Sequence, residues 1–320
     1  MIYIVLVLIS FFLTYFIKNY MIKKSFVASV NERSSHTVPT PHGGGIAIAI
    51  TWFIGLFYLY FIGQIENNLF YALLFGAVIS IVSFFDDIYE LSPKLRLIIQ
   101  AIVAIGGLYF LGGFETLTFG IFDIQNSIFT NIFAFFMIIW FINLYNFLDG
   151  INGYAGSEAV FLSLAGFILF GGNYFLVLAV AVLGFLYWNW NKAKIFMGDV
   201  GSTLLGYNVA IFTIYYSNEE PNNFWIWIIL FSVYWFDATL TLIRRKLNKE
   251  KLSLAHKKHA YQRLTQAGWS HYKVTNYSIG LNILLFTIVF FISNIFVAFL
   301  FTFVVLVLVM KFIDSKKAFE

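Results

Sequence analysis

Long apolar runs, each about the length of a membrane-spanning helix, follow one another along almost the whole chain and are separated by short polar stretches. A helix needs roughly 20 apolar residues to cross the hydrocarbon core of a bilayer. The pattern predicts about 11 such helices, with ends placed to within about 2–4 residues, near residues 1–20, 44–63, 69–85, 97–113, 128–147, 157–172, 174–190, 202–217, 224–243, 275–293 and 294–313. We therefore expect an all-α polytopic membrane protein that forms one integral-membrane domain over residues 1–320.

Composition supports this expectation, since 60% of the residues are hydrophobic, 21% are aromatic and only 11% are charged. Mean hydropathy is +0.82, which leaves no room for a sizeable soluble domain. The run from Ile2 to Ile17 has no preceding basic residues and no small-residue cleavage site, so we predict a retained first span rather than a signal peptide. The chain has no cysteine, which excludes disulfides and thiolate chemistry.

The 20 lysines and arginines indicate the orientation in the membrane. If the N-terminus is outside, all of them fall on one side of the predicted spans. The other side carries only acidic residues, Glu66, Glu115, Asp123, Glu219 and Glu220. Because basic residues concentrate in cytoplasmic loops, we predict that the N-terminus is outside and the C-terminus is cytoplasmic. The net charge of +4 is then a topology signal and no argument for nucleic-acid binding.

Two cytoplasmic segments end an apolar run with polar side chains. "VISIVSFFDD" ends in Asp86 and Asp87, a costly pair at the edge of hydrocarbon unless it has a function or is a solvated helix end. "INLYNFLDGINGYAG" spaces Asn143, Asn146 and Asp149 three apart, so on a helix they share one face. The glycines that follow allow a ligand to approach the backbone closely.

A third segment, "NKAKIFMGDVGST" at residues 191–203, places Asp199 between two glycines. Mg²⁺ prefers one or two carboxylates together with substrate phosphates and water, so Asp199 is a candidate ligand. Phe196 is a candidate for stacking on a planar base, although packing is the simpler interpretation. Asp237 is ionisable and lies within a predicted span, where it either has a partner inside the bundle or borders the cytoplasmic site.

Basic and histidine-rich segments supply candidate phosphate-binding groups: Arg33, His36, His256, His259 and Arg263. Contact with lipid headgroups and determination of topology are the alternatives for such loops. The polar segments, near 21–43, 86–96, 146–156, 191–201 and 244–274, are all cytoplasmic by the charge rule, and one active site would explain them together. A transporter or channel for an anionic substrate is the competing class, and a structural scaffold would not need the glycine-flanked Asp199.

The motifs "SFFDDI", "NLYNFLDGINGYAG", "KIFMGDVGSTLLG" and "AHKKHAYQR" resemble those of the polyprenyl-phosphate N-acetylhexosamine-1-phosphate transferases. This superfamily includes phospho-N-acetylmuramoyl-pentapeptide translocase, and the match runs in the family's order from residue 33 to residue 263. The predicted span arrangement resembles the bacterial GlcNAc-1-phosphate transferase branch. "RSSHTVPTPHGGG" and "HAYQR" resemble the subgroup that starts O-antigen or capsule repeat units.

The resemblance implies that undecaprenyl phosphate attacks the sugar-bearing phosphate of a UDP-N-acetylhexosamine and releases UMP. It also implies a Mg²⁺ cofactor, with Mn²⁺ as an alternative, and a multi-pass protein of the bacterial inner membrane whose active site faces the cytoplasm. The partners are then the two substrates and the lipid bilayer, and a homodimer is left open. The family also includes members that use N-acetylfucosamine-type sugars.

The resemblance further assigns roles by position. Asp199 matches a Mg²⁺-ligand motif, and Asn143 and Asn146 match a polar helix face that completes the metal or diphosphate site. The nucleotide-sugar pocket is assigned to Asp149, Gly150, Ile151, Asn152 and Phe196. Asp86 and Asp87 match paired aspartates that deprotonate or orient the lipid phosphate and help to hold the metal. A ping-pong route through an aspartyl-phosphate ranks below direct attack, because the lipid phosphate is itself a competent nucleophile.

Two positions depart from the family pattern. His256 and His259 are separated by two lysines, whereas many relatives have a tighter histidine cluster. Asn152 stands where the muramoyl-pentapeptide branch has aspartate. Both departures argue against a muramoyl-pentapeptide substrate.

Overall fold

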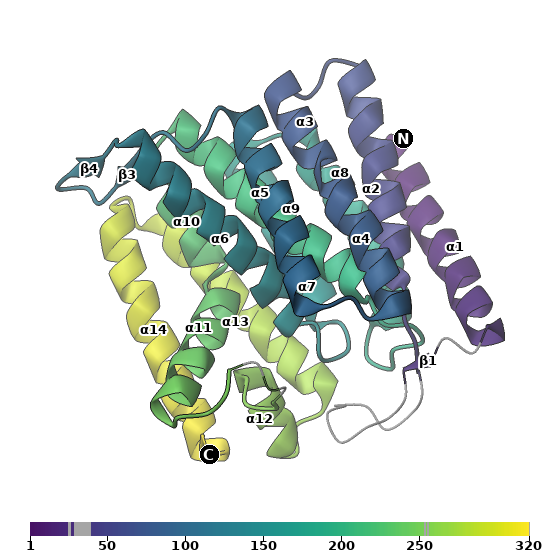
Figure 1. The fold of residues 1–320 in the computed structure, drawn as a ribbon. Helices are drawn as coiled ribbons and strands as arrows, with labels where there is room; N and C mark the ends of the chain where they lie inside the picture. The colour runs from purple at the N-terminus through teal and green to yellow at the C-terminus, as the bar shows by residue number, and fades with distance from the viewer. Residues whose placement is uncertain (25–26, 29–39, 253, 255, 320) are drawn as a thin grey trace.

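The structure is a computed structural model that describes residues 1–24, 27–28, 40–252, 254 and 256–319 (Figure 1). The elements of the first half are α1 (Ile2–Lys23), β1 (Val27–Ala28), β2 (Thr40–Pro41), α2 (Gly44–Phe61), α3 (Asn67–Leu74), α4 (Gly76–Tyr89), α5 (Pro93–Leu111), β3 (Leu117–Thr118), β4 (Asp123–Ile124) and α6 (Ser127–Phe147). Those of the second half are α7 (Tyr154–Phe170), α8 (Asn173–Asn189), α9 (Asp199–Glu219), α10 (Asn223–Leu230), α11 (Ser232–Leu247), α12 (Ala260–Gln266), α13 (His271–Phe291) and α14 (Ile295–Lys316).

The helices confirm an all-α polytopic membrane protein. Among the described residues, seven helical segments are long and apolar enough to cross a bilayer, or eight if the bent pair α10 and α11 forms one span. The helices α7 and α8 are apolar but shorter. Each predicted span coincides with one helix or with two consecutive helices. The number of actual crossings stays a prediction.

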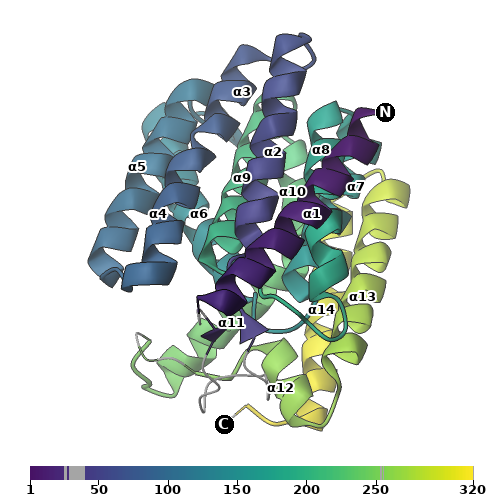
Figure 2. The ribbon, with the colours of Figure 1, turned by 90° about the vertical axis from the view of Figure 1, so that its right-hand side faces the viewer.

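α9 is the central helix of the bundle (Figure 1). Its residues from Val200 to Ser217 are all buried, and it contacts α2, α4, α5, α6, α7 and α10. A helix that is buried on every side needs no polar face, and small residues let its neighbours approach closely. α1 packs on the outside of the bundle against α2 and α8 (Figure 2).

The helices α2 and α9 approach each other closely where Gly45 meets Gly201. A Cβ atom on Gly45 would lie 2.2 Å from the backbone nitrogen of Gly201, and a Cβ on Gly201 would lie 2.8 Å from Cα of Gly45. Backbone atoms cannot rotate away as a side chain can. This contact therefore fixes where α9 begins relative to α2.

We expect Gly45→Ala to lower the free energy of unfolding by about 1–3 kcal/mol, because the added methyl group forces two backbones apart. The thermal melting temperature of the purified protein measures the effect. Gly280→Ala on α13 is the matched control, since a Cβ there meets nothing within 4 Å. Alanine has the higher helix propensity, so the control should melt no earlier than the unchanged protein. Equal melting of the two variants would contradict the close-contact explanation.

Three features differ from the sequence-based prediction. The predicted span 69–85 is broken between α3 and α4, and 224–243 is broken between α10 and α11, whose axes differ by 72°. β3 and β4 form a short antiparallel hairpin that the sequence did not predict. The basic segment 244–273 contains the helix α12 rather than a simple loop.

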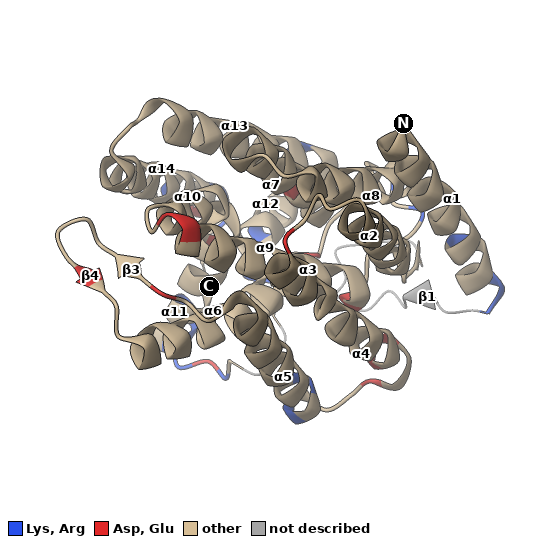
Figure 3. Cartoon of the chain, turned by 90° about the horizontal axis from the view of Figure 1, so that it is seen from above, with Lys and Arg blue, Asp and Glu red and all other residues tan. Residues whose placement is uncertain are grey.

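The described lysines and arginines lie at the lower end of the bundle in Figure 1. They occupy the lower ends of α1, α5, α11, α13 and α14, the helix α12, and the connections from α8 to α9 and from α11 to α12. Acidic side chains mark the opposite end. In Figure 3, which views the structure from above, the red segments that mark Asp and Glu at this end lie at β4 and just before α10. The two ends of the bundle therefore differ in charge as the sequence predicted.

Candidate active site

Asp199 begins α9 at the basic end of the bundle. The preceding Gly198 has φ of 76° and ψ of 178°, a conformation that favours glycine. Asp199 Oδ1 accepts a hydrogen bond of 2.8 Å from Asn146 Nδ2, which also donates to Ser202 Oγ at 3.0 Å. A carboxylate in the first turn of a helix is favoured by the positive end of the helix dipole. The conformation of Gly198 and the side-chain amide of Asn146 thus fix the position of the Asp199 carboxylate.

The adjacent aspartates of α4 have different surroundings. Asp87 is exposed, and its Oδ1 lies 3.4 Å from the backbone nitrogen of Asp199. Asp86 is buried and forms an ion pair of 2.7 Å with Arg96 at the start of α5. Asp86 also accepts a hydrogen bond of 2.7 Å from Leu91 N. Asp87 therefore faces α9, whereas Asp86 joins α4 to α5.

Asp149 lies in the connection from α6 to α7, at residues 148–153. The prediction that it continues the helical face of Asn143 and Asn146 is wrong, because α6 ends at Phe147. Its carboxylate instead accepts a hydrogen bond from the backbone of Gly198. Burial raises the pKa of Asp149 to about 7, and the charge of Asp199 adds to the increase. The carboxylates of Asp149 and Asp199 are therefore close enough for the charge of one to disfavour the charge of the other.

A pocket with an empty volume of about 520 Å³ opens between α4, α5, α6 and α9. Its polar lining comes from Ser83, Asp86, Arg96, Gln100, Asn143, Asn146, Asp199 and Thr203. Asn143 and Gln100 hydrogen bond reciprocally, with Asn143 Nδ2 donating at 2.7 Å and Gln100 Nε2 donating at 3.3 Å. The two asparagines of α6 therefore face one pocket, as predicted, but the Asn143 amide already has a partner.

The connection from α8 to α9 pairs with the start of α2. Phe196 N donates to Pro41 O at 2.8 Å, and Gly44 N donates to Phe196 O at 2.9 Å. His42 lies just before α2 in this pairing, and burial lowers the pKa of its imidazole. The candidate phosphate-binding residues Arg33 and His36 lie outside the described residues. Phe196 is therefore held beside the site by its backbone.

The other predicted nucleotide-sugar residues lie in the 148–153 connection. Ile151 is buried. Asn152 Nδ2 donates to Asn191 O at 2.8 Å, which joins this connection to the one between α8 and α9. Tyr261 of α12 covers Gly150, where a Cβ would lie 2.0 Å from the tyrosine hydroxyl oxygen. Gly150 is thus required for this contact.

The predicted phosphate-binding residues of the basic segment separate into two groups. The His256 and His259 rings lie 4.9 Å apart, and the His259 ring also lies 6.3 Å from that of Phe147, beside the 148–153 connection. Burial lowers the pKa of His256 to about 4, with further lowering by His259. Arg263 instead pairs with Asp314 of α14, so its guanidinium already has a carboxylate partner.

Sequence reasoning missed several residues that organise the site. Gln100 is a polar residue in the apolar run "LIIQAIVAIGG", which was the available signal. Asn189 accepts from Gly153 N at 2.8 Å and donates to Ile195 O at 2.9 Å, so it joins two site connections. Tyr261 lies within the motif "HAYQR", which was the available signal, but its aromatic ring alone did not distinguish it among 19 tyrosines.

The carboxylates of Asp87 and Asp149 both lie at the backbone of Gly198, the residue before Asp199. Within the described part of the chain, no group of three or more His, Cys, Asp or Glu has the arrangement of a complete metal site. Mg²⁺ commonly takes only one or two carboxylates and completes its shell with substrate phosphates and water. This donor set therefore fits a divalent cation that takes one or two carboxylates and its remaining ligands from substrate phosphates and water.

A polytopic helical bundle with carboxylates, amides and histidines at its basic end defines a membrane protein with a polar site beside the bilayer. Residues 69–217 match the family described as Glycosyl transferase family 4. A Bacillus subtilis protein named "Probable undecaprenyl-phosphate N-acetylglucosaminyl 1-phosphate transferase" is 32% identical over 283 residues, which cover 84% of this chain and 78% of that protein. The chain therefore belongs to glycosyl transferase family 4.

Two further relatives have the same kind of name. A Thermotoga maritima "Undecaprenyl-phosphate alpha-N-acetylglucosaminyl 1-phosphate transferase" is 32% identical over 203 residues, 62% of this chain and 60% of that protein. A Streptococcus pneumoniae "Phospho-N-acetylmuramoyl-pentapeptide-transferase" is 30% identical over 226 residues, 64% of this chain and 67% of that protein. These comparisons confirm the resemblance drawn from the motifs, without distinguishing the O-antigen or capsule subgroup.

Proposed function

We propose that this protein transfers N-acetylhexosamine 1-phosphate from a UDP-sugar to undecaprenyl phosphate and releases UMP. The observation that supports this most is that the carboxylates of Asp87 and Asp149 meet at Gly198, next to Asp199, at the basic end of an apolar bundle. A water-soluble nucleotide sugar reaches that end from solution, and a lipid phosphate reaches it from the bilayer. The names of the relatives support the same reaction.

The chain's own residues have little covalent chemistry to perform in this reaction. Phosphoryl transfer depends on positioning and on neutralisation of charge. The acceptor phosphate has a second pKa of about 6, so it is mostly dianionic at neutral pH and needs no strong base. We assign Asp87 to orienting the acceptor phosphate against the donor. The 148–153 connection and Phe196 hold the nucleotide, and His256 and His259 contact its phosphates.

Mg²⁺, or Mn²⁺ in its place, would be held by Asp199 together with Asp87 and the substrate diphosphate. When bound, such a cation neutralises the charge of the diphosphate. Asn146 fits a supporting role because its amide already donates to Asp199. Asn143 fits less well as a ligand, since it pairs with Gln100.

For the membrane arrangement we propose 11 crossings, with the N-terminus outside and the site facing the cytoplasm of a bacterial cell. The chain has no cysteine, so a single introduced cysteine is its only site of thiol labelling. Glu220→Cys should react with an impermeant maleimide added to intact cells, whereas Lys246→Cys should react only after permeabilisation. Both positions are exposed. The reverse labelling pattern would overturn this orientation.

The donor is proposed to be a UDP-N-acetylhexosamine other than the muramoyl-pentapeptide nucleotide. Asn152 and the spacing of His256 and His259 depart from that branch. The motifs of residues 33–45 and 259–263 favour the start of an O-antigen or capsule repeat unit. A panel of UDP-GlcNAc, UDP-GalNAc, UDP-FucNAc and UDP-QuiNAc covers this range.

Release of UMP by the purified protein tests the proposed function. We expect release that needs both a UDP-N-acetylhexosamine and undecaprenyl phosphate, stops in EDTA and returns with excess Mg²⁺. UMP release without the lipid phosphate would indicate hydrolysis instead. Full activity in EDTA would remove the cation from the proposal.

A further inference from the structure

The short helix α12 contacts both the predicted nucleotide-sugar loop and two carboxylates on other helices. We propose that α12 is a brace that sets the position of the 148–153 connection, and that Asp237 and Asp314 are positioning residues that hold the brace at its two ends. The proposal rests on the transferase function above, because it assigns these residues to binding of the UDP-sugar. None of them needs to touch a substrate.

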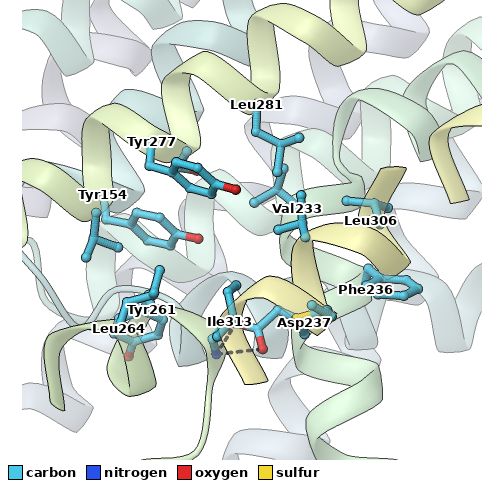
Figure 4. A pocket seen from close by; sticks show the side chains of 15 residues that line it. Tyr154, Val233, Phe236, Asp237, Tyr261, Leu264, Tyr277, Leu281, Leu306 and Ile313 are labelled. Atoms are coloured by element: carbon cyan, nitrogen blue, oxygen red, sulfur yellow. Dashed lines mark hydrogen bonds between the residues drawn. The ribbon is translucent and has the colours of Figure 1, made fainter. Parts of the chain in front are cut away.

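Asp237 of α11 holds the first residue of the brace. Its two carboxylate oxygens each lie 2.9 Å from Ala260 N, and Oδ1 lies 3.7 Å from His259 Nδ1. Thr241 Oγ1 donates to the same carboxylate at 3.1 Å. The side chain is only 5% exposed, and Figure 4 shows it hydrogen bonded at the edge of an apolar pocket. A buried carboxylate is costly unless it is paired, so this contact strongly specifies where α12 begins.

Asp314 of α14 holds the middle of the brace. Arg263 of α12 donates to Asp314, and Arg244 of α11 donates to it in a bidentate manner at 2.9 Å for both bonds. Arg263 also donates to Lys317 O at 3.1 Å. One carboxylate therefore joins three helices near the end of the chain. Bidentate guanidinium pairs have a fixed geometry, which suits a positioning role.

Phe319 packs beside the Arg244 and Arg263 guanidinium groups that bind Asp314. Its ring lies 5.2 Å from the Arg244 guanidinium carbon, 5.4 Å from that of Arg263 and 5.6 Å from Lys258 Nζ. Cations within about 6 Å of an aromatic ring are attracted to its face. The end of the chain thus packs against the cationic segment that carries the brace.

Tyr261 transmits the position of α12 to the site. Its hydroxyl donates to Phe147 O at 3.2 Å, and its ring packs against Gly150. The residue before Gly150, Asp149, accepts a hydrogen bond from the Gly198 backbone beside Asp199. A displacement of α12 therefore moves the connection that carries the predicted nucleotide-sugar residues.

Steady-state kinetics on the purified full chain test the positioning role. We expect Asp314→Ala, Phe319→Ala and Tyr261→Phe each to raise KM for the UDP-sugar by roughly tenfold, with KM for undecaprenyl phosphate unchanged. Asp314→Glu and Phe319→Trp should restore much of the loss. The double variant Tyr261→Phe with Asp314→Ala should be no worse than the more severe single variant, because both act through one contact. A lower melting temperature with unchanged KM, or additive effects, would overturn the proposal.

Hydrogen exchange of the amides of residues 148–153 tests the brace without any turnover. We expect faster exchange in Asp237→Asn, Asp314→Ala and Phe319→Ala. Phe301→Ala, a half-exposed aromatic on the same helix as Asp314, is the matched control and should exchange as the unchanged protein does. Unchanged amide exchange in all three of these variants would refute the proposal that α12 positions the 148–153 connection. An inactive wild type that shows the expected exchange pattern would refute the transferase alone, so the two proposals fail separately.

Discussion

Asp199→Asn should lower the rate of UMP release by about 10³-fold while the protein folds and inserts normally. The amide has the shape of the carboxylate and can still accept the hydrogen bond from Asn146, so packing around the start of α9 is preserved. The variant removes the negative charge that is proposed to hold the cation and, through it, the donor diphosphate. Replacement at the first turn also weakens the helix-dipole interaction, but only by about 0.3–1 kcal/mol.

Initial rates and melting temperatures of the purified variants measure this expectation. Asp123→Asn is the matched control, because it removes a carboxylate from β4 at the opposite end of the bundle. The control should keep the wild-type rate. More than about a tenth of the wild-type rate in Asp199→Asn would remove this residue from the catalytic assignment.

The second large expected effect concerns the adjacent aspartates Asp87 and Asp86, to which we assign different roles. Asp87→Asn should lower kcat by about 10²–10³-fold with an unchanged melting temperature, because this side chain is exposed and faces Asp199 across the site. Asp86→Asn should act mainly on stability. It breaks the ion pair with Arg96, whose side chain is 44% exposed, so we expect a loss of about 1–2 kcal/mol rather than that of a fully buried pair.

Measuring kcat and melting temperature for both variants distinguishes these roles. Arg96→Gln provides a cross-check, since it should reproduce the stability loss of Asp86→Asn. A fully active Asp87→Asn with an inactive, normally folded Asp86→Asn would show that the two roles are reversed.

Much of the fold could be predicted from the sequence, because in lipid a long apolar run has few alternatives to a helix. The 72° bend at Phe231 could not, since no proline or glycine stands between α10 and α11. The break at Phe75 is followed by Gly76, a single glycine in an apolar run, which is a weak signal on its own. α12 was missed because its seven residues are mostly polar. Its helical start depends on Asp237, a residue distant in the sequence.

The sequence predicted the arrangement of site residues that are a few positions apart on the same helix. Asn143 and Asn146 face one pocket for this reason. Asp149 was placed on the wrong element, because the sequence does not show that α6 ends at Phe147. The different surroundings of Asp86 and Asp87 depend on a partner from another helix, Arg96. The pairing of Arg263 with Asp314 also joins two helices. Local spacing carries no information about such partners.

The most direct test of the central claim follows the β-phosphate of the donor. Membranes containing the chain are supplied with Mg²⁺, undecaprenyl phosphate and UDP-N-acetylhexosamines labelled with ³²P in the β-phosphate. Our account predicts label in the solvent-extractable lipid, matched by unlabelled UMP and absent in Asp199→Asn. Labelled UDP with no label in the lipid would mean that the sugar moves without its phosphate. Intact donor accumulating inside sealed vesicles would indicate a transporter, and either result would contradict the account.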